Sequence, residues 1–181
     1  MTEVCADKER DDSDVFTDQG IDSSSPNAFY HDLAVQLAHL IAEETDDIAN
    51  LSNASALLHL HLTAINWVGF YLWHERTGEL VLGPFQGKPA CIRIPVGKGV
   101  CGTAVARREV MVVEDVHAFP GHIACDAASR SEIVVPMYVG DRLVGVLDID
   151  APVPGRFGPA DKEGLTEVVA TLLQGTEFAL R

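Results

Sequence analysis

The architecture of this chain follows from residues 66–86, which read NWVGFYLWHERTGELVLGPFQ. Residues 66–75 and 80–86 are rich in aromatic and aliphatic side chains, which favour β-strands. The RTGE segment between them has the composition of a turn. Together the three segments predict a β-hairpin, and the remaining elements can be placed outward from it.

The first strand of this hairpin has two different faces, because side chains alternate along a strand. The aliphatic face is expected in the core, and its members are Val68, Phe70 and Leu72. Trp67 and Tyr71 share the other face, with Gly69 leaving room between them. We expect both rings to line a pocket. The alternative, which is more common for a tryptophan on a strand, is that the two rings only pack over the sheet.

Helices are expected at both ends of the chain. Residues 26–41 and 47–63 carry apolar residues at helical spacing, and the Ser-Pro pair at 25–26 is typical of a helix start. After the hairpin we expect, in order, a Gly-rich loop opening a short helix (95–109), a strand (110–116), a long loop (117–131), a second hairpin (132–139 and 143–150) and a helix from Pro159. This order predicts an α+β fold, in which an antiparallel sheet packs helices on one face and loops close a pocket on the other.

Charge and composition exclude several classes of function. The chain has 181 residues and a formal net charge of −14. A protein of this charge lacks the basic surface that binds nucleic acid, and an anionic membrane would repel it. No apolar run is long enough to span a bilayer, and the first residues lack the apolar centre of a signal peptide, so we expect a cytoplasmic protein. Residues 1–25 are acidic and Ser-rich and predict a disordered tail; residues 26–181 form the folded domain.

The four cysteines, at positions 5, 91, 101 and 125, include no C-x-x-C pair. In a reducing compartment they are expected as thiols rather than as permanent disulfides. Cys125 lies in the long loop, beside Asp126 and near two histidines. An inert, partly buried thiol is the ordinary interpretation; a reactive thiolate, its pKa lowered by a helix N-terminus or a cationic histidine, is the functional one.

Cys91 and Cys101 could each form a disulfide with an oxidised Cys125 if loops bring them close enough. Cys91 follows a flexible stretch, whereas Cys101 lies near a helix start, where the dipole favours a thiolate. A zinc site is the competing use of these side chains, and its ligands would be Cys91, Cys101, Cys125, His117 and His122. Their spacings match no familiar site, so no metal and no cofactor is expected.

Asp148 and Asp150 share one face of a strand whose opposite face carries Leu147 and Ile149. Acids on strands are usually a solvated edge. Glu132 begins the neighbouring strand, and an in-register hairpin would place it beside Asp150. Three carboxylates in one pocket repel each other unless a cation is present, so this group is a candidate binding site for a cation.

Several long segments resemble the GAF domain family and, within it, the free methionine-(R)-sulfoxide reductases. They are NWVGFYL, GPFQGKPAC, GKGVCGTAV, HAFPGHIACDAAS, HIACDAASRSEIVVP and GVLDIDAP. The similarity extends from about Phe29 to the C-terminal helix and leaves the acidic tail out. It implies reduction of free methionine (R)-sulfoxide, with Cys125 as the nucleophile and with a thiol at Cys91 or Cys101 resolving the sulfenic acid; we favour Cys91.

The resemblance also implies that all three carboxylates bind substrate. The α-ammonium group of a free amino acid is a cation that they could hold, and Trp67 and Tyr71 suit its S-methyl group. Glu132 or Asp150, with a raised pKa, is our candidate for protonating the sulfoxide oxygen. A thioredoxin-like protein is the expected reductant. A homodimer is one of the assemblies that we consider. The alternative function is a GAF module that senses a ligand or redox state without turnover.

Overall fold

The computed structural model describes residues 20–121 and 126–181. Its helices are α1 (Pro26–Leu40), α2 (Asp47–His61), α3 (Gly99–Arg107), α4 (Pro159–Gln174) and the short 3-10 helix η2 (Val116–Ala118). Its strands are β1 (Trp67–His74), β2 (Glu79–Gly87), β3 (Arg93–Pro95), β4 (Met111–Val113), β5 (Ser131–Val139) and β6 (Arg142–Ala151). They form one antiparallel sheet in the order β3-β2-β1-β6-β5-β4, which confirms the α+β class.

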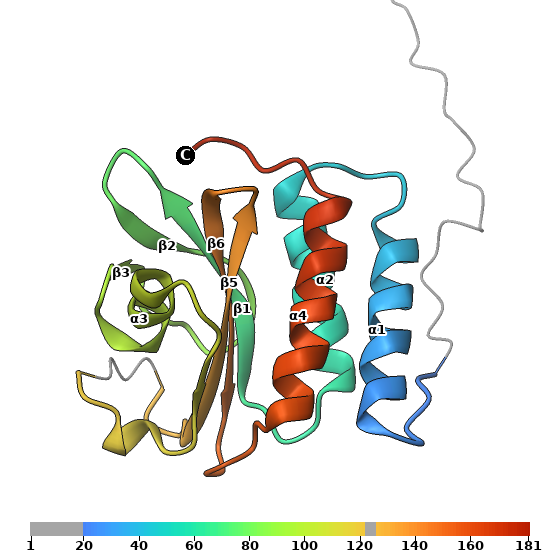
Figure 1. The fold of residues 1–181 in the computed structure, drawn as a ribbon, viewed down its shortest axis with the longest axis horizontal. Coiled ribbons are helices and arrows are strands. Elements are labelled where there is room, and N and C mark those ends of the chain that lie inside the picture. Colours follow the sequence, from blue (N-terminus) through green and yellow to red (C-terminus); the bar gives the residue numbers. More distant parts are fainter. Residues whose placement is uncertain (1–19, 122–125) are drawn as a thin grey trace, which may run out of the picture.

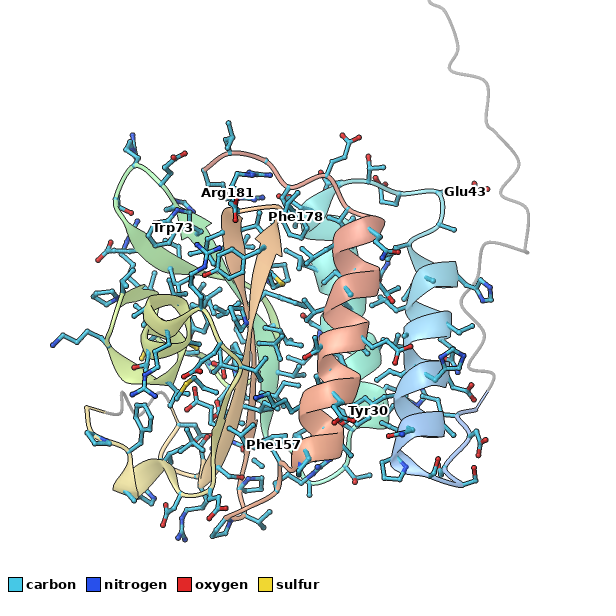
Figure 2. All side chains as sticks on the ribbon, in the orientation of Figure 1. Tyr30, Glu43, Trp73, Phe157, Phe178 and Arg181 are labelled. Carbon is cyan, nitrogen blue, oxygen red and sulfur yellow. The ribbon has the colours of Figure 1, made fainter. Side chains whose placement is uncertain are left out.

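Helices α2 and α4 lie against one face of the sheet, α1 packs outside them against α4, and α3 lies on the other face (Figure 1). The first helix begins where the sequence predicts, because the Ser25 hydroxyl accepts a hydrogen bond from the Ala28 amide at 3.1 Å and Pro26 occupies the first turn. Side chains fill the space between these helices and the sheet, with buried Phe157 and Phe178 near the two ends of α4 (Figure 2). Among the described residues, no helix is both long and apolar enough to cross a bilayer.

The faces of β1 are assigned as the alternation predicts. Val68, Phe70 and Leu72 belong to the core beneath the three helices. Trp67 and Tyr71 belong to a second buried cluster, which α3 completes on the opposite face. Gly69 permits this arrangement, because a Cβ there would lie 2.3 Å from the Cβ of Phe85.

The central strands bring the predicted carboxylates into register. In the β5–β6 hairpin, Glu132 pairs with Asp150, as expected for an in-register hairpin. In the neighbouring β1–β6 pair, Trp67 lies opposite Asp150 and Gly69 lies opposite Asp148. The aromatic residues and the acids therefore share the sheet face that α3 covers.

Three local features differ from the expectation. Strand β3 forms because Arg93 and Ile94 pair with the edge of β2, a contact that no local pattern indicates. Strand β4 ends at Val113 rather than at residue 116, since the Asp115 carboxylate accepts from the His117 amide and caps the turn of η2. Helix α3 lies on the pocket side of the sheet, not with the other helices.

Candidate functional site

A pocket with a cavity volume of about 30 Å³, partly open to solvent, lies between the sheet, α3 and the segments that follow β2 and precede β5. Six of the eight predicted site residues line it, namely Trp67, Tyr71, Cys101, Glu132, Asp148 and Asp150. The seventh, Cys91, is intermediate in exposure and lies outside the lining. The eighth, Cys125, lies outside the described residues, as does His122 of the zinc alternative.

One wall of the cavity is aromatic. The rings of Trp67 and Tyr71 stack with centroids 5.9 Å apart, and the ring of Phe85 also stacks with Trp67, with centroids 5.4 Å apart. The Trp67 indole nitrogen donates to the backbone oxygen of Lys88 at 3.1 Å, which satisfies its polar atom. The wall is therefore rigid and apolar, as contact with a small thioether or methyl group requires.

The three carboxylates lie close to this wall and are almost fully buried. Glu132 and Asp148 are each 6% exposed, and Asp150 is 9% exposed. Burial raises the pKa of Asp148 to about 7 and, with help from the nearby Asp148 charge, raises the pKa of Asp150 to about 8. The pKa of Glu132 also lies well above its usual range, first because of burial and then because of both aspartates. Near neutral pH the group therefore holds protons until a cation arrives.

One oxygen atom of the Asp148 carboxylate is available to accept a hydrogen bond from a ligand. No donor from residues 20–121 or 126–181 reaches its buried Oδ1 atom. A buried carboxylate oxygen without a partner carries a large desolvation cost. A ligand that brings a positive charge or an N–H donor would remove this cost, so the site is built to bind such a ligand.

We expect the ligand-free protein to lose stability as pH rises. The carboxyl groups of Asp148 and Asp150 have pKa values in the folded chain, about 7 and about 8, that exceed the ordinary aspartate pKa of 3.8. Stability contributed by their bound protons is complete at acid pH and is lost as pH rises through about 7–8. Chemical denaturation should show a free energy of unfolding lower at pH 9 than at pH 6, by on the order of 4 kcal/mol.

Asp148→Asn should flatten this dependence, because the amide cannot titrate. Asp141→Asn, a change of an exposed aspartate in the turn before β6, is the matched control and should retain the wild-type slope. Equal slopes in all three proteins would show that the buried acids are not protonated as described.

Cys101 is the free thiol among the described residues. It is 2% exposed, and its Sγ lies 4.0 Å from the Glu132 Oε1. Burial, followed by the charges of Asp148 and Glu132, raises its pKa well above the ordinary value. The expectation that the helix start would favour a thiolate is therefore not met, because desolvation and nearby acids outweigh the dipole.

Cys91, by contrast, is disulfide-bonded. Its position after β2 and before β3 places it beside the flexible stretch that the sequence indicates. The two candidate resolving cysteines therefore differ in state: one is engaged in a disulfide, and the other is a buried, protonated thiol among acids.

A polar network at the pocket entrance was missed by sequence reasoning. The Asn66 amide donates to Asp126 at 3.3 Å and to the Ser129 hydroxyl at 3.1 Å, and the Lys88 Nζ lies 3.2 Å from Asp126. The hydrogen bond from the amide of Ala128, followed by the interaction with Lys88, lowers the pKa of Asp126. The network ties the residue that follows Cys125 to the start of β1. The only sequence signal was that Asn66 and Lys88 fall inside two of the segments that resemble the reductases.

The sheet order, the three helices on one side of the sheet and the pocket under α3 define a GAF domain, and the model of the GAF domain family matches residues 34–175. The free methionine-R-sulfoxide reductase of Escherichia coli K12 is 60% identical over 144 residues, covering 80% of this chain and 86% of the relative. The Saccharomyces cerevisiae enzyme of the same name is 45% identical over 137 residues, covering 72% and 76%. The chain belongs to the free methionine-R-sulfoxide reductase family of GAF domains.

Solved structures agree with this assignment. The Neisseria meningitidis free methionine-R-sulfoxide reductase in complex with its substrate superposes with a TM-score of 0.82 at 45% identity, covering 86% of this chain and 93% of that one. The Staphylococcus aureus enzyme, also in complex with substrate, gives a TM-score of 0.76 at 57% identity, covering 81% and 94%.

Proposed function

We propose that this protein reduces free methionine (R)-sulfoxide to methionine. The observation that carries this proposal is the pocket in which buried Glu132, Asp148 and Asp150 face an aromatic wall. A free amino acid offers an ammonium group to the acids and an S-methyl group to the rings. A methionine sulfoxide within a protein has an uncharged amide nitrogen instead, so the acids select for the free molecule.

Lys88 supplies the charge that the substrate's carboxylate needs. Among the described residues that line the pocket, it is the one with a positive charge. It lies at the entrance, where it pairs with Asp126, and its side chain is 69% exposed. We propose that it orients the carboxylate of the substrate while the acids hold the ammonium group.

The chemistry requires two thiols and one external reductant. The Cys125 thiolate attacks the sulfoxide sulfur to form an S–S bond, while a buried carboxyl protonates the oxygen. The resulting hydroxyl then passes from the substrate sulfur to the Cys125 sulfur as the S–O and S–S bonds break, so methionine leaves and Cys125 becomes a sulfenic acid. A second thiol condenses with the sulfenic acid to give a disulfide and water. A dithiol reductant, for which a thioredoxin-like protein is the natural class, then restores both thiols.

We assign the resolving role to Cys91. Its engagement in a disulfide supports this choice, and so does the protonated, buried state of Cys101 among three acids. Reduction by a thioredoxin-like protein fits the cytoplasmic location expected from the sequence. The homodimer and the disordered tail stay predictions. Of the predicted tail, residues 1–19 lie outside the described residues. The backbone oxygen of Gly20, the first described residue, accepts a hydrogen bond from the Gln36 side chain.

Cys91→Ser should separate reduction from recycling. Single-turnover reduction by the pre-reduced protein should stay within about threefold of wild type, because attack by Cys125 precedes resolution. Steady-state turnover with thioredoxin should fall by at least about tenfold, since no protein disulfide can form. Cys101→Ser is the comparison; a recycling defect in that variant but not in Cys91→Ser would reverse the assignment.

Lys88→Met should raise KM for free methionine sulfoxide by about threefold to tenfold, with a smaller effect on kcat. The range reflects a partly exposed charge pair, which contributes less than about 1.4 kcal/mol. Steady-state kinetics would measure it, with Lys162→Met on α4 as the matched control. An unchanged KM would remove Lys88 from the binding scheme.

A sensory GAF module is the second candidate, and turnover distinguishes the two. The assay incubates the protein with a large excess of free methionine (R)-sulfoxide and dithiothreitol, and methionine is quantified over time. A reductase produces many equivalents of methionine per protein. A redox sensor without cycling stops at about one equivalent, and a ligand sensor produces none.

A further inference from the structure

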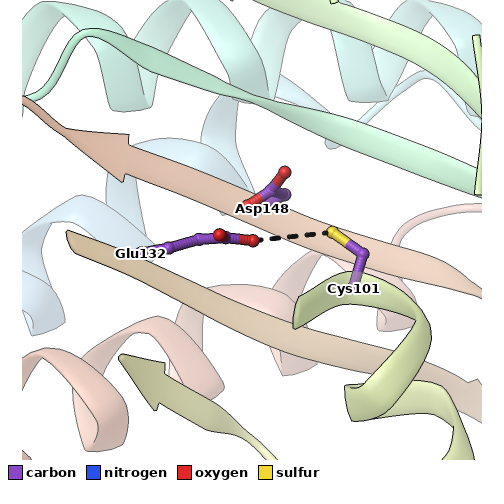
Figure 3. Close-up of side chains that lie close together, drawn as sticks. All are labelled: Cys101, Glu132 and Asp148. Atoms are coloured by element: carbon purple, nitrogen blue, oxygen red, sulfur yellow. Dashed lines mark hydrogen bonds between the residues drawn. The ribbon is translucent and has the colours of Figure 1, made fainter. Parts of the chain in front are cut away.

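Cys101, Glu132 and Asp148 converge in the pocket from three different elements, α3, β5 and β6 (Figure 3). One ligand atom from each lies within 4.8 Å of the other two. The Cys101 Sγ lies 4.0 Å from the Glu132 Oε1. All three side chains are buried. This set shares only Cys101 with the zinc ligands considered from the sequence.

We propose that these three residues, here called the Cys101 triad, form a binding site for Zn²⁺. A thiolate and two carboxylates are ligands that zinc accepts, and a tetrahedral ion with three protein ligands leaves its fourth position for water. Zinc–sulfur and zinc–oxygen bonds of about 2.3 and 2.1 Å place tetrahedral ligand atoms about 3.6 Å apart. The triad atoms therefore need to approach one another by only about an ångström.

The unpartnered oxygen of Asp148 is independent evidence that the triad faces a missing ligand. Within the described parts of the chain, nothing donates to its Oδ1 although the atom is buried. The Cys101 Sγ and the Glu132 carboxylate lie beside the same group. A divalent ion would supply the positive charge that this oxygen lacks and would offset the repulsion among three adjacent anionic ligands.

The donor set selects against the abundant hard cations. Mg²⁺ and Ca²⁺ prefer six or more oxygen ligands and retain water, whereas the triad offers one sulfur and a small buried space beside Trp67 and Tyr71. A thiolate favours zinc and its chemical relatives. Zinc is therefore the physiological ion to test, and Co²⁺ is its spectroscopic probe.

Zinc and substrate should exclude each other, because both use Glu132 and Asp148. This consequence rests on the proposed function; metal binding by the triad does not. Free methionine carries the same ammonium group as the substrate and should displace the metal. Zinc should correspondingly act as a competitive inhibitor.

The test uses the full chain with Cys5, Cys91 and Cys125 each replaced by serine, so that Cys101 is its one remaining thiol. Co²⁺ is added in increments, and the thiolate-to-cobalt charge-transfer band is followed. The expected result is a band that saturates at one equivalent and disappears when Zn²⁺ or excess free methionine is added. Thermal melts confirm that each variant remains folded.

Three further variants in this background locate the site. Cys101→Ser should remove the band, and Glu132→Gln or Asp148→Asn should weaken Co²⁺ binding by at least tenfold. Glu163→Gln on α4 is the matched control and should bind normally. The proposal would be overturned if no band appeared or if the band persisted in Cys101→Ser. It would also be overturned if Glu132→Gln and Asp148→Asn bound Co²⁺ as tightly as the control Glu163→Gln.

The metal site and the proposed activity can fail separately. Turnover of methionine sulfoxide is measured with the wild-type chain in the presence of a chelator, where the triad is empty. Absence of turnover there would refute the reductase proposal while a cobalt band still established the metal site. Turnover without a cobalt band would refute the metal site and leave the reductase proposal supported.

Discussion

Cys125→Ser is expected to lower reduction of free methionine sulfoxide by at least about a thousandfold. A hydroxyl is a far poorer nucleophile than a thiolate toward the sulfoxide sulfur, and groups that act with the nucleophile cannot replace it. The readout is single-turnover formation of methionine, which is independent of the external reductant. Because this step precedes resolution, the loss should exceed that of any other single cysteine replacement.

Cys5→Ser is the matched control for this variant. It makes the same chemical change in the predicted tail, outside the folded domain, and should retain wild-type turnover. Binding of free methionine should also survive in Cys125→Ser, because the acids and the aromatic wall are unchanged. Substantial methionine formation by Cys125→Ser would mean that another thiol is the nucleophile.

Asp148→Asn is expected to lower kcat/KM for free methionine sulfoxide by about tenfold to a hundredfold. A hydrogen bond between an ammonium group and a carboxylate contributes roughly 1.5–3 kcal/mol, and about 1.4 kcal/mol corresponds to one factor of ten. The open Oδ1 of Asp148 makes it the acceptor that the substrate should engage first. Asp150→Asn should have an effect of similar size.

N-acetyl methionine sulfoxide tests whether the lost interaction is the one with the ammonium group. It lacks the cation, so the wild type should reduce it poorly, and Asp148→Asn should lose little further activity on it. Asp141→Asn should behave as wild type on both substrates. Equal losses of Asp148→Asn on the two substrates would assign Asp148 a role other than ammonium binding.

Much of the pocket could be predicted because strands impose a period of two. The alternation in β1 places Trp67 and Tyr71 on the face opposite Phe70, and the short turn of the second hairpin sets Glu132 beside Asp150. Both inferences need only local geometry, and the structure confirms both. The resemblance to the reductases was confirmed by the comparisons with known proteins.

Other features depend on contacts between distant parts of the chain and left no local signal. The three-residue strand β3 exists because Val81 pairs with Arg93, and its own sequence has no strand pattern. The state of Cys101 is decided by its burial and by acids that lie far from it in the chain. The link between Lys88 and Asp126 joins residues 38 positions apart.

Reduction of separated diastereomers tests the central claim most directly. Purified free methionine (R)-sulfoxide and (S)-sulfoxide are each incubated with the protein and dithiothreitol, and methionine is quantified by chromatography. The account predicts many turnovers of the R form, with little or no methionine from the S form, and loss of the R activity in Cys125→Ser. Methionine formation from neither form would contradict the reductase function, and equal rates on both would contradict its stereochemistry.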